Sequence, residues 1–407
     1  MTHLLRKRRP VIAGLSGAVL GTAIGLVLFG NAESLAVGPL RGRDPLAGNF
    51  QVGAAGSGQG IYGSASSVST GDMARESANP PDLKVRSFEL VSQLTGPDAG
   101  AGWDERWNVT GTDLGFSFEN EGQTYLVFGD TWGRSGVEGP DWRSNVMAIA
   151  TDEPGSGFIV RDMVTDEDGQ AKELLASLKK PGREYTVIPT SGIAVGGRMY
   201  LHYMSVRDWK GTSWGYRGPA VNGAGFAFSD DGGQSWVKDE SARWTGETSF
   251  TQAAMVEDGG HIYVFGTPAG RFGPAKLLRT TGDRLLDPDS YEYWSDSGWA
   301  DDAAMAAVVV PAPVGELSVR WSPYHERWLM MYLNDVTHNI VLRTAERLEG
   351  PWDAEQVVVQ AREYPTLYAP FMLPQISGPD IYFTMSLFNV YNVFLVRMRV
   401  EKPALSS

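Results

Sequence analysis

From residue 84 onward, hydrophobic and polar positions follow one pattern that repeats five times along the chain. The centre of each repeat is a five-residue run of mostly apolar side chains with an aromatic residue near its start. The five runs are 124–128, 199–203, 261–265, 327–331 and 381–385. Short apolar runs that are rich in aromatic and branched residues are typical of buried strands. The regular recurrence predicts five similar structural units.

Each central run lies between two further predicted strands. The preceding strands, which contain small or polar residues, span 112–118, 190–194, 251–255, 317–321 and 368–373. The following strands span 146–150, 225–228, 275–279, 339–343 and 393–400. Three strands and a more variable outer strand, repeated five times, predict an all-β fold, a five-bladed β-propeller. We expect residues 84–94 to close the ring as the outer strand of the last blade, and we predict one helix-like run, 171–180, between the first two blades.

Two local motifs fit this architecture. The spacing Ser229-x-Asp231-x-Gly233-x-x-Trp236 resembles the Asp-box turn of propeller glycosidases, in which the aspartate caps a hairpin. Residues 348–352, Leu-Glu-Gly-Pro-Trp, resemble a strand exit of five-bladed glycosidases. We interpret both motifs as structural.

The first 82 residues lack the repeat. Four cations at positions 6–9 precede an apolar stretch from 11 to 29, which is typical of an export signal. Cleavage after Ala32 is compatible with the small residues there, whereas an uncleaved stretch of this length could span a bilayer. We therefore assign 1–32 to a signal peptide or membrane anchor, 33–82 to a flexible Gly/Ala/Ser-rich linker and 83–402 to the propeller. The protein is expected to be exported, and then secreted or anchored through residues 11–29 at the outer side of the cytoplasmic membrane, in the cell envelope.

Composition narrows the classes of chemistry. The 407 residues carry a formal net charge of −13, which argues against a nucleic-acid partner because phosphate binding needs clustered Lys and Arg. The absence of cysteine excludes a disulfide framework, a thiolate metal site and a thiol nucleophile. The five histidines are dispersed, so we expect no dedicated transition-metal site and no cofactor, while the sequence leaves open whether a cation fills the channel. We also expect a monomer.

Two aspartates stand where a propeller binds its ligand, at the mouth of the central channel. Asp113 starts the first predicted inner strand, and Asp130 follows the next strand. Antiparallel strands joined by a short turn place the start of one beside the end of the other, so both carboxyl groups should project to the same rim. Such a pair can supply the proton donor and the base or nucleophile of glycoside hydrolysis. The alternative is that both residues serve turns and strand ends, as aspartates commonly do.

Other polar and aromatic residues lie on the inner strands or beside the two aspartates. The candidate substrate-binding residues are Trp132, Ser191, Gln252, Glu316, Arg320 and Tyr368. We expect the polar members to bind sugar hydroxyls. Trp132, together with Trp103 and Trp107, could stack on the apolar faces of sugar rings.

Three segments resemble motifs of the actinobacterial endo-D-arabinanases, a glycoside hydrolase family formerly catalogued as a domain of unknown function. They are 111–115 (Gly-Thr-Asp-Leu-Gly), 128–132 (Phe-Gly-Asp-Thr-Trp) and 348–352. The resemblance implies a five-bladed propeller that cleaves internal α-D-arabinofuranosyl linkages of envelope arabinan, in arabinogalactan or lipoarabinomannan. It also implies that Asp113 and Asp130 are the catalytic pair.

The residues leave several alternatives open. They do not decide which aspartate is the acid, or whether hydrolysis inverts or retains the anomeric configuration. The same fold would also suit a glycosidase acting on another furanoside polymer, or a propeller that binds glycan without cutting it.

Overall fold

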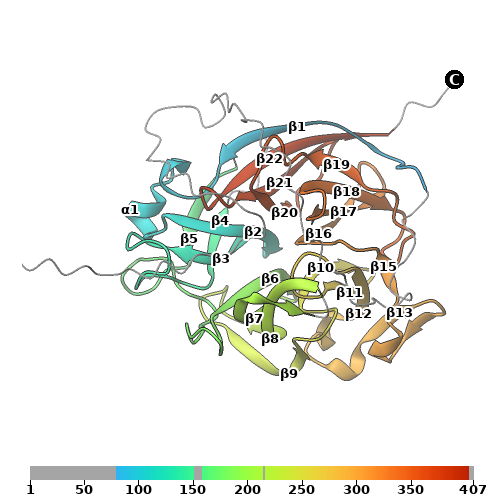
Figure 1. Ribbon diagram of the computed structural model, residues 1–407, viewed down its shortest axis with the longest axis horizontal. Helices are drawn as coiled ribbons and strands as arrows, with labels where there is room; N and C mark the ends of the chain where they lie inside the picture. Colours follow the sequence, from blue (N-terminus) through green and yellow to red (C-terminus); the bar gives the residue numbers. More distant parts are fainter. Residues whose placement is uncertain (1–78, 151–157, 214–215, 403–407) are drawn as a thin grey trace, which may run out of the picture. The chain divides into compact units, whose positions relative to one another are not determined.

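The computed structural model describes residues 79–150, 158–213 and 216–402, which form five antiparallel sheets arranged as the blades of a propeller (Figure 1). Blade 1 contains β2 (Gly111–Asn120), β3 (Gln123–Trp132), β4 (Val146–Ala150) and β5 (Val160–Met163). Blade 2 contains β6 (Thr186–Val195), β7 (Arg198–Ser213), β8 (Tyr216–Ser229) and β9 (Val237–Thr245). The predicted all-β, five-bladed fold is confirmed.

The remaining blades follow in chain order. Blade 3 contains β10 (Gln252–Asp258), β11 (His261–Thr267), β12 (Ala275–Thr281), β13 (Glu292–Ser295), β14 (Gly298–Ala300) and β15 (Val308–Val310), which also pairs with β12. Blade 4 contains β16 (Leu317–Ser322), β17 (Arg327–Asn334), β18 (Asn339–Ala345) and β19 (Gln356–Val359). Blade 5 contains β20 (Leu367–Met372), β21 (Asp380–Leu387), β22 (Asn392–Glu401) and β1 (Lys84–Gln93). The short helices are η1 (Pro97–Ala99), α1 (Trp103–Trp107), η2 (Gly282–Arg284), η3 (Pro288–Ser290) and η4 (Ala303–Met305).

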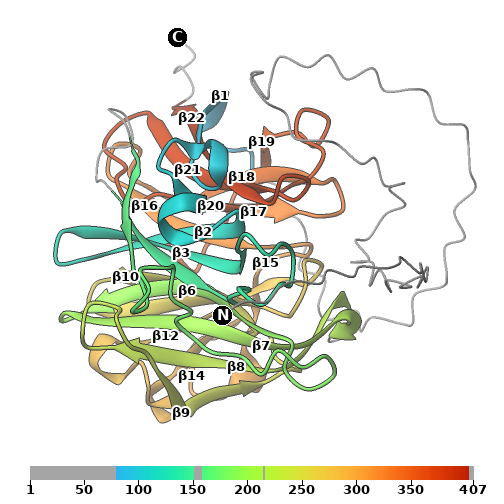
Figure 2. The ribbon, with the colours of Figure 1, turned by 90° about the vertical axis from the view of Figure 1, so that its left-hand side faces the viewer.

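The ring closes by pairing the first described strand with the last. β1 runs antiparallel to β22, with Val85 opposite Val400 and Leu90 opposite Val396. The blue β1 accordingly lies beside the red β22 in two perpendicular views (Figures 1 and 2). This confirms the predicted closure, which covers the outer edge of blade 5 and leaves fewer unpaired backbone groups.

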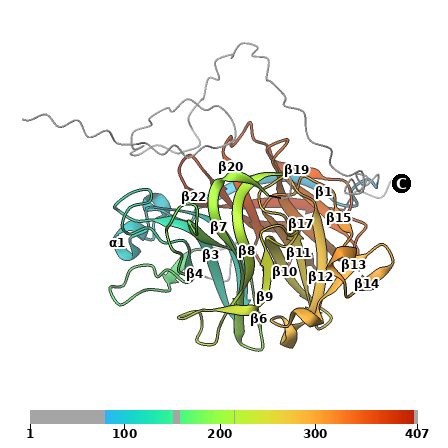
Figure 3. The ribbon, with the colours of Figure 1, turned by 60° about the horizontal axis from the view of Figure 1, so that its bottom comes forward.

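The second strands of blades 1, 3 and 4 are the most deeply buried strands of their blades. In β3, every residue from Thr124 to Trp132 is buried, and β17 is buried from Trp328 to Asn334. Such a strand has a neighbour on each edge and packed side chains on both faces, so its sequence reads as a nearly continuous apolar run. The long hairpin of β7 and β8 in blade 2 is seen along its length in Figure 3.

The inner strands β2, β6, β10, β16 and β20 contact one another in sequence around the axis. They enclose a cavity of about 20 Å³ lined by residues of all five, among them Ser117, Ser191, Ala254, Ser318 and Phe371. This volume holds about one water molecule, so the middle of the channel is filled by side chains. A ligand therefore has to approach from an end of the channel.

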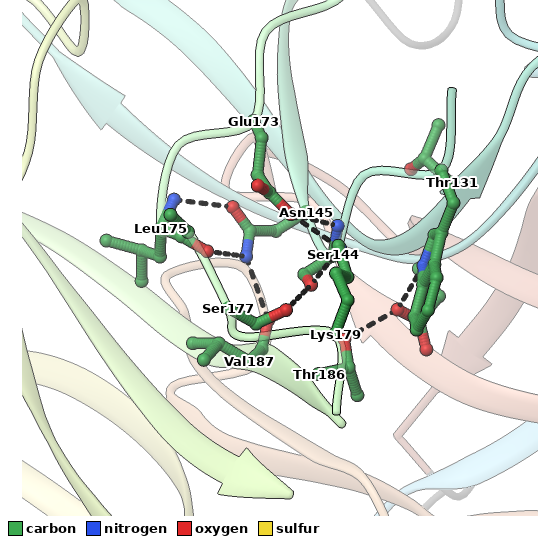
Figure 4. Close-up of polar contacts among 12 residues, drawn as sticks. Thr131, Ser144, Asn145, Glu173, Leu175, Ser177, Lys179, Thr186 and Val187 are labelled. Atoms are coloured by element: carbon green, nitrogen blue, oxygen red, sulfur yellow. Dashed lines mark hydrogen bonds and ion pairs between the residues drawn. The ribbon is translucent and has the colours of Figure 1, made fainter. Parts of the chain in front are cut away.

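The predicted helix at 171–180 is wrong, because this segment contains no helical turn. The side chain of Asn145 on blade 1 takes the place of the helical backbone partners. Its Oδ1 accepts the backbone N–H groups of Leu174 and Leu175 at 3.0 and 2.8 Å, and its Nδ2 donates to the carbonyl oxygens of Leu175 and Val187 at 3.0 and 2.8 Å (Figure 4). A tertiary contact thus overrides a modest local helix preference.

The predicted signal peptide or anchor, 1–32, and nearly all of the predicted linker, 33–82, lie outside the described residues. Within 79–150, 158–213 and 216–402, no helix has the length and hydrophobicity needed to cross a bilayer.

The closure predicts a measurable contribution of β1 to stability. A chain that begins at Leu94 should melt roughly 5–10 °C below a chain that begins at Asn79, because it exposes the edge of β22 and loses the contacts of one strand. Differential scanning calorimetry of the two chains checks this. Equal melting temperatures would show that β1 is not needed to close the ring.

Candidate active site

Asp113 and Asp130 lie on the two sides of an irregularity in the β2–β3 pair. Thr112 pairs with Thr131 and Leu114 pairs with Phe128, so the single residue Asp113 lies opposite both Gly129 and Asp130. The extra residue on β3 makes a β-bulge, a feature that re-aims side chains near active sites. Across this bulge, the charge of Asp130 raises the pKa of Asp113.

The backbone around the bulge is constrained. Leu114 has φ 67°, a conformation that is uncommon for a branched residue, and Gly115 follows with φ 85°. A Cβ atom at Gly129 would lie 2.4 Å from Oδ1 of Asp113, so a side chain there would displace the carboxyl group. Gly115 in the 111–115 motif and Gly129 in the 128–132 motif therefore help to position Asp113.

Asp113 is held in an environment that favours its protonated form. The hydroxyl of Tyr368 donates to Oδ2 at 3.0 Å, while Oδ1 is shielded from solvent and has no hydrogen-bond partner among the described residues. Burial, followed by the charge of Asp130, raises the pKa of Asp113 to about 8, and the hydroxyls of Tyr368 and Tyr391 partly oppose this rise. At neutral pH, Asp113 is therefore mainly a carboxylic acid.

Asp130 has stronger support for its ionised form. Its Oδ1 accepts hydrogen bonds from Thr186 Oγ1 at 2.6 Å and from Trp142 Nε1 at 2.9 Å. Burial raises its pKa to about 6, and these two donors, with the charge of Lys179, limit the rise. At neutral pH, Asp130 is therefore mainly a carboxylate. The two acids are poised in opposite protonation states, which sequence reasoning left undecided.

Six aromatic rings form a continuous series beside the two acids, which we call the aromatic arc. In order, the rings belong to Tyr185, Trp142, Trp132, Tyr391, Phe388 and Tyr368. The centroids of successive rings lie 5.2, 5.6, 5.4, 5.9 and 6.5 Å apart. Trp142 and Tyr185 are half-buried. The arc runs from the start of blade 2, across the end of β3, to blade 5. Trp132 and Tyr368 are buried, so the half-buried rings of the arc are the ones that offer apolar faces of the kind that pack against sugars.

Three of the predicted binding residues lie with the two acids. Trp132 belongs to the arc, and Tyr368 both belongs to it and contacts Asp113. Glu316 precedes β16, and its charge contributes to the raised pKa of Asp113. Glu316 is in turn paired with Arg271 at 2.7 Å, and the Arg271 guanidinium lies 5.1 Å from the centroid of the Tyr368 ring.

The other three predicted binding residues contact the main chain within the propeller. Ser191 Oγ accepts the backbone N–H of Met255 at 2.9 Å. Gln252 Nε2 donates to the carbonyl oxygens of Pro268 and Gly270, which follow β11 in the same blade. Arg320 donates to the carbonyl oxygen of Ser117 at 2.5 Å and lines the axial cavity. Their proposed contacts with substrate stay predictions.

Trp103 and Trp107 differ from the expected stacking residues. They are 0% and 3% exposed and pack in α1 against each other and the core, so sugar rings cannot reach them. Sequence reasoning missed Trp142, Thr186 and Tyr391. Thr186 could have been found by its place at the start of an inner strand, which it shares with Asp113 and Tyr368. Trp142 and Tyr391 lie in loops, where no repeat pattern marked them.

The sequence matches the family model described as Domain of unknown function (DUF4185) over residues 100–397. The chain belongs to the DUF4185 family. A comparison of this DUF4185 protein with curated proteins found no match.

Several solved structures resemble the DUF4185 propeller. One is a Bacteroides ovatus protein that has been proposed to be a hydrolase, with 14% identity and a TM-score of 0.53 over 73% of this chain and 87% of that chain. At this identity the similarity shows the fold alone. An alpha-L-arabinofuranosidase from Podospora anserina matches with 11% identity and a TM-score of 0.44, over 80% of this chain and 99% of that chain. A family 117 glycoside hydrolase from the marine bacterium Zobellia galactanivorans matches with 13% identity and a TM-score of 0.43, over 79% and 92%.

The raised pKa of Asp113 predicts a specific pH dependence of stability. The unfolded chain releases this proton near the ordinary value of 3.8, whereas the folded chain keeps it up to about 8. Between these values the folded state binds more protons, so the free energy of unfolding falls as the pH rises. Replacing the acid by a neutral amide, Asp113→Asn, removes this loss. The melting temperature of the variant minus that of the wild type should therefore increase from pH 4 to pH 8.

Thermal melts of both proteins at several pH values check this, with Asp162→Asn, an exposed aspartate of blade 1, as the control. A difference that stays constant across the range would show that Asp113 titrates normally.

Proposed function

We propose that this protein is a glycoside hydrolase in which Asp113 is the general acid and Asp130 is the general base. The observation that carries this proposal is that the two acids are held in different protonation states. Their surroundings raise the pKa of Asp113 to about 8 and the pKa of Asp130 to about 6. Neighbouring acids whose environments separate their pKa values are the pattern by which one site supplies both a proton donor and a proton acceptor near neutrality.

The reaction follows from these states. Asp113 gives its proton to the glycosidic oxygen as the bond between that oxygen and the anomeric carbon breaks. Asp130 takes a proton from a water molecule, whose oxygen forms the new bond to the anomeric carbon through an oxocarbenium-like transition state. Asp113 ends as a carboxylate and Asp130 as an acid, and exchange with solvent restores both. This direct displacement inverts the anomeric configuration.

The contacts of each acid suit its part. Asp130 accepts both of its hydrogen bonds through Oδ1, which leaves Oδ2 without a donor among the described residues, as a general base requires. Oδ1 of Asp113 has no hydrogen-bond partner among the described residues, so it can carry the transferable proton. The rate should therefore be highest between the two pKa values, about 6 and about 8, where Asp130 is ionised and Asp113 is protonated.

The proposed substrate is arabinan of the cell envelope, cut at internal α-D-arabinofuranosyl linkages. The motifs at 111–115 and 128–132 support this assignment through their resemblance to endo-D-arabinanases, and both motifs hold the acids. The aromatic arc supports a neutral saccharide, since its ring faces can pack against C–H groups. Export to the envelope, predicted from residues 1–32, would place the enzyme beside such a polymer.

A non-catalytic glycan-binding propeller is the second candidate, because the aromatic arc would serve binding as well as hydrolysis. The two functions differ in one requirement. A glycan-binding protein has no need of a buried acid pair, which lowers the free energy of unfolding near neutral pH. Release of oligosaccharides separates the two functions.

Replacement of either acid should remove activity. Asp113→Asn and Asp130→Asn are each expected to lower hydrolysis by about 10²–10⁴-fold, because each loses one proton-transfer step. The assay is chromatography of oligosaccharides released from arabinogalactan, with linear L-arabinan as the comparison polymer and Asp162→Asn as the control variant.

Near-normal turnover in either acid variant would remove that residue from the mechanism. Cleavage of L-arabinan in preference to arabinogalactan would replace the proposed substrate. Binding of arabinogalactan by the wild type without release of product would favour the glycan-binding function.

A further inference from the structure

The two acids are supported by parallel sets of side chains. Each acid accepts a hydrogen bond from an aromatic side chain, each aromatic ring lies near a cation, and each cation is paired with a glutamate. The set at Asp113 is Tyr368, Arg271 and Glu316. The set at Asp130 is Trp142, Lys179 and Glu173.

Lys179 belongs to the irregular 171–180 segment that Asn145 fixes to blade 1. Its ammonium group contacts Glu173 Oε1 at 2.7 Å and Ser144 Oγ at 2.5 Å (Figure 4). The same Glu173 oxygen accepts the backbone N–H of Ser144 at 2.7 Å. The Lys179 backbone itself has φ 53°, in the left-handed region. The cation is therefore held in place, unlike most lysines, whose flexible stems leave the charge in solvent.

The position of this cation matters because of Trp142. The Lys179 Nζ lies 4.1 Å from the centroid of the Trp142 ring, within the range of a cation–π contact. The indole N–H of the same ring donates to Asp130 Oδ1 at 2.9 Å. A cation against the ring withdraws electron density and strengthens the N–H as a donor, and its charge also attracts the carboxylate directly.

Other charges face Asp130 from the surrounding elements. Asp113 on β2 is the other acid of the pair. The charge of Glu138, in the β3–β4 loop, raises the pKa of Asp130. Tyr185, just before β6, donates to Glu138, and its ring lies tilted against Trp142 with the centroids 5.2 Å apart. Lys179 is the cation that acts against these groups, and its charge lowers the pKa of Asp130.

The corresponding cation at Asp113, Arg271, forms a direct ion pair with Glu316, as Lys179 does with Glu173. The two sets differ in the charge that acts on the acid: the charge of Glu316 raises the pKa of Asp113, whereas the charge of Lys179 lowers the pKa of Asp130.

We propose that Lys179 is a positioning residue that acts through the Trp142 ring on Asp130 and keeps this carboxylate aimed and ionised as the base of the reaction. This inference rests on the function proposed above. It assigns a role in proton transfer to a lysine that does not contact Asp130 by a hydrogen bond and that lies outside every motif of the sequence.

The test compares variants that separate charge from packing. Lys179→Met removes the charge and keeps most of the stem. Lys179→Gln removes the charge but can still hydrogen-bond Glu173 and Ser144. Lys179→Arg keeps the charge. Lys172→Met is the matched control, because Lys172 lies on the same segment but binds the carbonyl oxygen of Gln234 at 2.6 Å.

The primary readout does not depend on turnover. Aspartate is labelled with ¹³C at its carboxyl carbon, the Asp130 signal is identified by its loss in Asp130→Asn, and its titration is followed by NMR. In the wild type the midpoint should lie near 6. Both uncharged variants should raise it by about half a unit, the arginine variant should restore it, and the control should leave it unchanged. The acid limb of kcat/KM should move by the same amount, with kcat at pH 6 falling and KM nearly constant.

An unchanged Asp130 midpoint in folded Lys179→Met and Lys179→Gln would overturn the role of Lys179, whether or not the protein hydrolyses arabinan. A raised midpoint in the methionine variant alone would overturn the electrostatic account, since the glutamine variant also lacks the charge. Loss of the proposed function has a different signature: the wild type releases no product although the Asp130 titration responds to Lys179. Thermal melts establish which variants are folded.

Discussion

The proposed chemistry depends on the burial of two carboxyl groups, Asp113 and Asp130, on the two sides of one β-bulge. Burial is the largest cause that raises the pKa of each acid, and the charge of Asp130 raises the pKa of Asp113 further, so one acid keeps its proton near neutrality. The surroundings decide which one does. Asp130 receives two donors on one oxygen, whereas an oxygen of Asp113 has none among the described residues. This difference converts two chemically identical residues into a donor and an acceptor.

The propeller is suited to this task because the supporting groups come from different blades. Thr186 belongs to blade 2, Tyr368 to blade 5, and the acids themselves to blade 1. Only a closed ring brings the starts of these inner strands together at one mouth. The pairing of β1 with β22 therefore supports the site as well as the scaffold, since it completes the blade that carries Tyr368. Side chains placed on strands and locked by neighbours hold a reacting geometry better than loop residues do.

Electrostatic balance extends beyond the direct contacts. An aromatic ring lies between each acid and a buried or half-buried ion pair, so charges that never touch the reacting groups still influence their protonation. At Asp113 the glutamate of the pair contributes to a raised pKa, and at Asp130 the lysine opposes the rise. The aromatic arc thus has two properties at once: its half-buried rings present apolar faces suitable for sugars, and its members Trp142 and Tyr368 donate hydrogen bonds to the acids.

The sequence by itself determined the five-bladed fold and the inner strands, and it placed Asp113 and Asp130 at neighbouring strand ends. It could do so because the middle strand of a blade is buried on both faces and leaves a repeated apolar run, and because a hairpin fixes which ends of its strands meet. It failed at 171–180, where the side chain of Asn145 replaced the helical hydrogen bonds that local preference predicted. It also could not find Trp142, Tyr391 or Lys179, which come from irregular segments without a period. Tertiary structure alone decided which aspartate keeps its proton, because pKa values depend on burial and on donors that are distant in sequence and adjacent only after the ring has closed.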